Sequence, residues 1–154
     1  MNYSKGRKIY IIISAVLVVA VAIIIFLLSS QTATNSANTS GSLIDLIFSL
    51  FGKAPNQTVI RTLAHFCEYA LFGFLVSNLY FALKNKLNPI LCIGLSWGYS
   101  WTDEIHQLFV PGRAFQLTDL AVDLGGIILG VAVFCILIIL KRKVKNRKSK
   151  NTDK

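Results

Sequence analysis

The stretch IYIIISAVLVVAVAIIIFLL, residues 9–28, decides the class of this fold. Its residues are apolar apart from Tyr10 and Ser14, and about 20 such residues are what an α-helix needs to cross the hydrocarbon core of a bilayer. A cleaved signal peptide has a shorter apolar core of about 7–15 residues. The sequence therefore predicts a retained membrane span at this position.

The composition of the whole chain agrees with a membrane protein. Of its 154 residues, 54% are hydrophobic and only 15% are charged, whereas charged residues make up about 25% of a soluble domain. The net charge of +9 raises the question of a nucleic-acid partner. The Lys and Arg residues lie between apolar segments and at the termini, without the aromatic-interleaved basic domain that reads nucleic acid. We therefore expect no nucleic-acid partner.

Three further segments have the length and composition of a membrane span. They are residues 62–83, 89–110 and 117–140, the last of which begins with Asp119 and Asp123 and is apolar beyond them. Each is close to the length that a spanning helix requires. We therefore predict an all-α integral membrane protein, in which residues 9–140 form a bundle of four transmembrane helices.

The distribution of basic residues predicts the orientation of these spans. Thirteen of the sixteen lie before the first span, between the second and third, or after the fourth: Lys5, Arg7, Lys8, Lys84, Lys86, Lys141, Arg142, Lys143, Lys145, Arg147, Lys148, Lys150 and Lys154. Loops rich in Lys and Arg remain on the cytoplasmic side. We therefore expect residues 1–8 and the basic tail, residues 141–154, to be cytoplasmic, and the tail to contact anionic lipid.

The loop between the first two spans, residues 29–61, is predicted to lie outside. It begins with a stretch rich in Ser, Thr, Asn and Gln and then becomes apolar at LIDLIFSLF, residues 43–51. Nine residues are too few to span a bilayer. We expect this segment to form a short helix in the outer interface.

Ionisable residues are concentrated where the last three spans reach the outer side. The groups are Arg61, His65 and Glu68; Asp103, Glu104, His106 and Gln107; and Asp119 and Asp123. At 100° per residue, most members of each group share one helix face. Polar faces are costly in lipid, so we expect them to face one another or a water-filled cleft. Glu104 lies about 100° from Asp103, which indicates a separate contact, with Arg113 or with the last span.

Small residues predict how the helices approach and turn. Gly94-x-x-x-Gly98 and Gly126-x-x-x-Gly130 have the spacing that lets two helices pack closely. Val110-Pro111-Gly112-Arg113 suits a tight reversal between the third and fourth spans. That turn would hold Arg113 beside the polar cluster.

The cluster has an imbalance of charge that favours a functional interpretation. It contains five acids, Glu68, Asp103, Glu104, Asp119 and Asp123, against two permanent cations, Arg61 and Arg113. Protons, charged His65 and His106, or a bound cation must balance the excess. A structural network holding the helices in register is the alternative, but such buried networks are costly.

Three kinds of function remain open from the residues alone. Arg61 and Arg113 could bind the phosphate or carboxylate of an amphiphile, which suits the guanidinium fork. His65, Glu68, Asp103 and His106 could instead serve as acid–base catalysts or hold a divalent cation, although their spacing matches no established zinc pattern. Ion transport is disfavoured because the inner halves of the spans carry few polar residues beyond Ser77 and Asn78.

Three stretches resemble one family of bacterial membrane proteins, the VanZ-like family. They are SSQ at residues 29–31, RTLAHFCEYALFG at 61–73, and DEIHQLFVPGRAFQLTDLAVDLGGIILG at 103–130. Many members carry Asn where this chain has Asp123. The resemblance implies a multi-pass protein of the bacterial plasma membrane. The family's namesake is associated with low-level resistance to teicoplanin, a lipid-tailed glycopeptide antibiotic.

The resemblance and the residues together give one working hypothesis and two alternatives. We expect recognition of a lipid-linked or lipid-tailed envelope molecule, with an effect on glycopeptide sensitivity. The alternatives are an acid–base or metal-dependent enzyme acting on an envelope lipid, and a structural membrane partner protein. The expected ligand-binding residues are Arg61, His65, Glu68, Tyr69, Asp103, Glu104, His106, Gln107, Arg113, Asp119 and Asp123.

Overall fold

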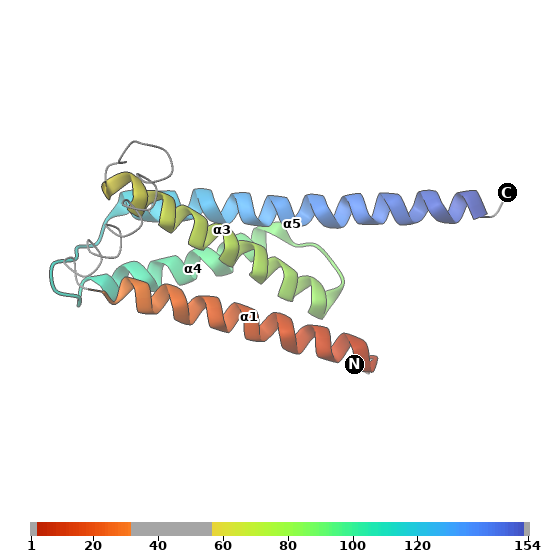
Figure 1. Ribbon diagram of the computed structural model, residues 1–154, viewed down its shortest axis with the longest axis horizontal. Helices are drawn as coiled ribbons and strands as arrows, with labels where there is room; N and C mark the ends of the chain where they lie inside the picture. The colour runs from red at the N-terminus through yellow and green to blue at the C-terminus, as the bar shows by residue number, and fades with distance from the viewer. Residues whose placement is uncertain (1–2, 32–56, 153–154) are drawn as a thin grey trace, which may run out of the picture.

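The computed structural model describes residues 3–31 and 57–152, and all of its regular structure is helical. The elements are α1, Lys5–Ser29; α3, Gln57–Lys84; α4, Pro89–Gln107; and α5, Leu117–Thr152 (Figure 1). The four predicted helical segments are therefore present. The predicted interfacial segment at residues 43–51 lies outside the described residues.

Local signals in the sequence set the helix ends. The side chain of Ser4 accepts a hydrogen bond from the backbone N–H of Arg7 at the start of α1. Asn88 accepts from the N–H of Leu91 at the start of α4, where Pro89 supplies a fixed φ. Asn85, with φ of 53°, follows the last residue of α3 and ends that helix in the left-handed conformation.

Three of the described helices are long and apolar enough to cross a membrane. These segments are Lys5–Ser29, Thr58–Lys84 and Leu117–Arg147. Helix α4 has 19 residues and is not among them. Several of its positions carry polar side chains, including Ser96, Ser100 and Asp103. The membrane crossing of the third predicted span, residues 89–110, thus stays a prediction, and that segment is helical only to Gln107.

Polar side chains of α4 face inward, while apolar side chains face outward. Ser96, Ser100, Asp103 and Gln107 are all buried. On α1, by contrast, Ile12 and Val16 are about 60% exposed. An apolar exterior around a polar interior is the arrangement expected in lipid, where an exposed polar group is costly. The predicted inward orientation of the polar face of α4 is confirmed.

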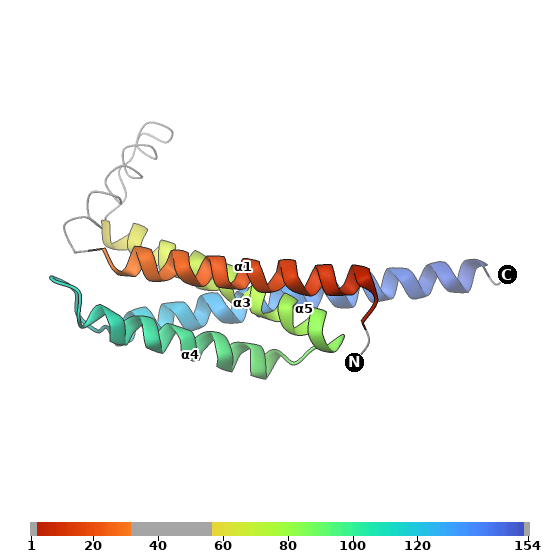
Figure 2. The same cartoon turned by 90° about the horizontal axis from the view of Figure 1, so that it is seen from below.

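Helix α3 is the central element, because its contacts with the other described helices are the most extensive. Its contact with α5 is the most extensive, and the ribbons of the two helices cross at an angle in both views (Figures 1 and 2). The apolar core lies around Tyr69 and Phe72 of α3 and Ile127 and Val131 of α5. Helix α5 continues past the other helices, so residues 141–152 extend the helix of the fourth predicted span.

Glycines make the contact between α3 and α5 very close. A Cβ atom at Gly126 would lie 2.3 Å from the backbone oxygen of Phe66, and one at Gly130 would lie 1.9 Å from that of Ala70. Gly73 of α3 packs in the same way against Ile127. The packing predicted for Gly126-x-x-x-Gly130 is confirmed. The same prediction was wrong for Gly94 and Gly98, where no atom among the described residues would lie within 4 Å of an added Cβ.

The two ends of the bundle differ in which helices begin and finish there. At the end that we call the site end, α1 and α4 finish while α3 and α5 begin. At the opposite end, the terminal end, α1 begins, α3 finishes and the C-terminal part of α5 passes (Figure 1). The start of α1 and the end of α5 therefore lie toward the same end of the bundle. The cytoplasmic location of that end stays a prediction.

Candidate functional site

A buried carboxylate connects three helices at the site end. Asp123 of α5 has no exposed surface, and its Oδ1 lies 3.3 Å from Nδ1 of His65 on α3. Its Oδ2 accepts a hydrogen bond of 2.6 Å from the hydroxyl of Ser100 on α4. An ionised carboxylate only accepts hydrogen bonds, so with Asp123 ionised the first contact would place a proton on Nδ1 of His65. Asp123 therefore fixes the orientation of the His65 ring.

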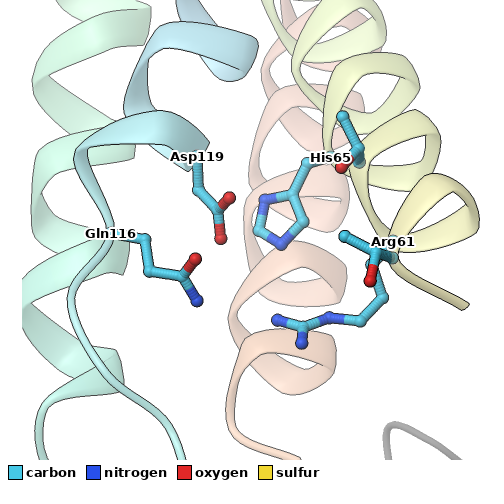
Figure 3. Close-up of a pocket in the computed structure, with 6 residues that line it drawn as sticks. Arg61, His65, Gln116 and Asp119 are labelled. Atoms are coloured by element: carbon cyan, nitrogen blue, oxygen red, sulfur yellow. The ribbon is translucent and has the colours of Figure 1, made fainter.

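The other edge of His65 faces a small pocket (Figure 3). Its cavity volume is about 50 Å³, enough for a few water molecules or one polar group of a ligand. The lining residues are Thr58, Arg61, Thr62 and His65 of α3, Gln116, and Asp119 of α5. In Figure 3 the His65 ring lies between Asp119 and Arg61, with a nitrogen pointing toward the space beside Gln116.

Opposite charges line this pocket without neutralising each other. Among the described residues, His65 and Asp123 form the one contact between basic and acidic side chains short enough for an ion pair. Arg61 and Asp119 both line the pocket, yet neither takes part in such a contact within that part of the chain. Within the described part of the chain, this cation and this carboxylate form no ion pair and can therefore contact a ligand.

The two neighbouring acids of α4 have different surroundings. Glu104 is fully buried, and its Oε2 accepts a hydrogen bond of 3.0 Å from the backbone N–H of Gln116, next to the start of α5. The separate contact predicted toward the last span is thus confirmed. Asp103 is 3% exposed, and within the described residues neither carboxylate oxygen has a hydrogen-bond partner. It is the least satisfied acid of the cluster.

His106 lies apart from the pocket. Its Nε2 is 3.1 Å from the hydroxyl of Ser30, and its ring packs on Phe26 with centroids 4.4 Å apart. Both partners belong to the end of α1. The sequence placed His106 and Asp103 on one face, but the structure directs His106 toward α1 while His65 contacts α5. The two histidines therefore serve different contacts.

Arg113 is held by the predicted turn. Gly112 has φ of 77°, and the N–H of Arg113 donates to the carbonyl of Val110 at 3.1 Å, so this Pro-Gly turn is confirmed. The Nε of Arg113 donates to the backbone oxygen of Gln31 at 3.2 Å. Burial lowers the pKa of Arg113 from its usual value, and the nearby Arg61 lowers it further. A guanidinium remains charged despite such a shift.

The remaining predicted residues border the cluster without lining the pocket. Tyr69 and Gln107 are buried, and Glu68 is half-buried one turn along α3 from His65. Sequence reasoning missed Ser100 as the second partner of Asp123, and Ser30 as the partner of His106. The SSQ stretch at 29–31 was the available signal for Ser30. Ser100 shared the polar face of α4 but carried no charge to draw attention to it.

The arrangement gives no support to a metal site. Among the residues that the structure describes, no group of three or more His, Cys, Asp or Glu side chains could hold a metal ion. His65, Glu68, Asp103 and His106 were the residues considered for that role. The contact of His106 with α1 separates it from His65, which removes the second imidazole that the sequence had suggested.

The chain was compared with known proteins. The family described as VanZ/LLP1 matches residues 14–139. This range runs from α1 into α5 and includes the whole pocket together with His65, Ser100 and Asp123. No curated protein and no solved structure matches the chain.

Proposed function

This chain belongs to the VanZ-like family of membrane proteins, and we propose on that basis that it recognises the polar headgroup of a lipid-linked or lipid-tailed cell-envelope molecule. The pocket at the site end would receive the headgroup. Binding there would influence sensitivity to glycopeptides of the teicoplanin type. The observation that carries this proposal is that one pocket contains Arg61, which forms no ion pair with a described residue, and His65, which Asp123 orients.

Arg61 supplies the main attraction for an anionic group. A guanidinium has five N–H donors in a planar fork that matches phosphate and carboxylate. No acidic side chain among the described residues occupies this fork. Hydrogen bonds to a charged partner contribute about 1.5–3 kcal/mol each. One such bond from Arg61 to a phosphate or carboxylate would raise the affinity for the ligand roughly ten- to a hundredfold.

The other lining groups suit the uncharged parts of a headgroup. The carboxylate of Asp119 can accept from hydroxyl or amide groups, and Gln116, Thr58 and Thr62 can both donate and accept. Apolar side chains on neighbouring positions, Leu63 and Leu117, are more than half exposed and would contact a lipid tail. The site thus combines a polar pocket with an apolar surround, as an amphiphile requires.

Substitution of Arg61 tests this proposal. Cells that express each variant at equal membrane levels are assayed for the inhibitory concentration of teicoplanin. Arg61→Gln should remove most of the effect of the protein, and Arg61→Lys should retain part of it, because the charge remains without the fork. Arg147→Gln is the matched control, since Arg147 is exposed on α5 and does not line the pocket. An Arg61→Gln protein with full effect would contradict the proposal.

A second candidate, acid–base catalysis on an envelope lipid, is favoured by the contact of Asp123 with His65. An acid that orients a histidine, whose other nitrogen faces a substrate pocket, is a recurrent arrangement for a general base. Purified protein would be incubated with lipid extract, and products would be sought by mass spectrometry. His65→Gln should abolish turnover in an enzyme and weaken binding only by degrees in a receptor.

A further inference from the structure

Among the described residues, the terminal end of the bundle carries positive charge with no acidic side chain to balance it. The described residues 3–31, 69–102 and 124–152 include the segments that form this end, and none of them is Asp or Glu. Arg7 of α1, Lys84 of α3 and Arg142 of α5 are therefore not offset by a described acidic side chain at this end. Such an excess is attractive to an anion.

A pocket opens at this end between α1 and α3. Its volume is about 330 Å³, within the range of small-molecule sites, and it is lined by Arg7, Tyr10, Phe81, Ala82 and Asn85. Tyr10 and Phe81 give it an apolar wall. Arg7 and the amide of Asn85 give it a polar rim. We call it the terminal pocket.

The guanidinium of Arg7 is held in place by contacts that leave some of its N–H donors unused. Its Nε donates to the carbonyl of Ala82 at 3.1 Å, and its Nη2 donates to that of Leu83 at 3.2 Å. The Tyr3 ring lies 4.6 Å below the guanidinium carbon. These two hydrogen bonds use two of the five N–H donors of an arginine. The remaining N–H donors lie at the wall of the pocket. Because the side chain is already held, contact with a ligand would cost it little further conformational entropy.

A second arginine stands at the edge of the same pocket. The Nη2 of Arg142 donates to the carbonyl of Asn85 at 3.2 Å, and its guanidinium carbon lies 5.4 Å from the centre of the Phe81 ring. Both arginines thus cap the end of α3, whose free carbonyls carry about half a negative charge. Two full positive charges exceed that half charge, so capping alone leaves the pocket cationic.

We propose that the terminal pocket binds the phosphodiester headgroup of an anionic phospholipid. Arg7 would contact the phosphate, and Tyr10 and Phe81 would contact the glycerol and the first acyl carbons. A membrane lipid fits better than a soluble phosphate because Ile9 and Ile13, on the same turns of α1 as Arg7 and Tyr10, are about half exposed and apolar, as expected at a lipid-facing level. This site is independent of the headgroup pocket at the site end.

Native mass spectrometry of the full chain in detergent tests the proposal. The probes are phosphatidylglycerol and phosphatidylcholine with identical acyl chains. The wild-type protein should prefer phosphatidylglycerol, and Arg7→Gln should reduce that preference more than tenfold. Lys8→Gln is the matched control, because Lys8 is exposed on the same helical turn and does not line the pocket. It should lose no more than the roughly fivefold expected of one surface charge.

A second variant separates binding from folding. Asn85→Gly removes the side chain from the pocket while keeping the positive φ of 53°, which glycine adopts freely. Its stability should be preserved, and its preference for phosphatidylglycerol should fall severalfold. Equal losses for Arg7→Gln and Lys8→Gln would overturn the proposal, as would a wild-type protein without preference. Displacement of the bound lipid by equimolar glycerophosphate would overturn the assignment to a lipid.

Discussion

Asp123 and His65 lie 3.3 Å apart on different helices, although Asp123 has no exposed surface at all. The second oxygen of the carboxylate accepts from Ser100 on a third helix. One side chain therefore sets the relative position of α3, α4 and α5 at the site end. It also determines which nitrogen of His65 faces the pocket.

Removing the acceptor at Asp123 should destabilise the bundle. Asp123→Ala leaves the hydroxyl of Ser100 and Nδ1 of His65 without a buried partner, at a cost of about 1–3 kcal/mol for each. Asp123→Asn retains one carbonyl acceptor and should cost less. Thermal unfolding in detergent measures both variants. Equal losses for Ala and Asn would show that the charge of Asp123 matters more than its hydrogen bonds.

Replacing Asp103 should have the opposite effect on stability. Its carboxylate is buried and has no hydrogen-bond partner among the described residues. Asp103→Leu removes that unpaired polar group at similar side-chain volume, so the unfolding free energy should rise by about 1–3 kcal/mol. Asp119→Leu, at a partly exposed position, should change it by less than about 0.5 kcal/mol. A less stable Asp103→Leu protein would show that Asp103 makes a needed contact.

Substitutions of His65 and of His106 should differ in their effect on teicoplanin sensitivity. His106→Phe keeps the ring that packs on Phe26 and removes only the contact with Ser30, which costs about 1 kcal/mol. Its effect on teicoplanin sensitivity should stay near that of the wild-type protein. His65→Phe should lose that effect, because His65 lines the pocket. Equal loss from both substitutions at matched expression would place His106 in the site after all.

The glycines of α4 and α5 should respond differently to alanine. At Gly130 the added Cβ would lie 1.9 Å from the backbone oxygen of Ala70, so the helices must separate, and the cost should be at least the 1–3 kcal/mol typical of overpacking. At Gly94 nothing described lies within 4 Å, and alanine should stabilise the helix by about 0.5–1 kcal/mol. Unfolding in denaturant compares the two. A destabilised Gly94→Ala protein would reveal a contact on that face.

The helices were predictable because apolar runs of span length leave few alternatives. Three of the observed helices extend beyond the predicted spans, as when α1 begins at Lys5 and α5 continues to Thr152, whereas α4 ends at Gln107, short of its predicted end. Hydropathy predicts how long the apolar part of a helix is. The capping residues and the helix propensity of the flanking residues determine where the backbone hydrogen bonds of the helix end. The charge-rich start of α5, with Asp119 and Asp123, was also correctly placed beside His65.

The neighbours of each side chain were harder to predict than its helix face. Periodicity placed Asp103 and His106 on one face of α4 but could not show that α1 packs against His106. The same limit explains the two glycine motifs. Their spacing is identical, yet only Gly126 and Gly130 meet another helix within the described chain. The residue pattern of one helix predicts the face from which each side chain projects. The residue that the side chain contacts depends on how all the helices pack together.

The continuity of α5 has a mechanical consequence. Its 36 residues make a rod about 54 Å long, with the pocket residue Asp119 near one end and basic residues toward the other. The glycine contact with α3, at Gly126 and Gly130, lies between them. The segment from Gly130 to Thr152 is about 33 Å long, so a tilt of α5 by about 10° about this contact would move its far end by about 6 Å. A small displacement beside the pocket would thus become a larger one at the terminal end.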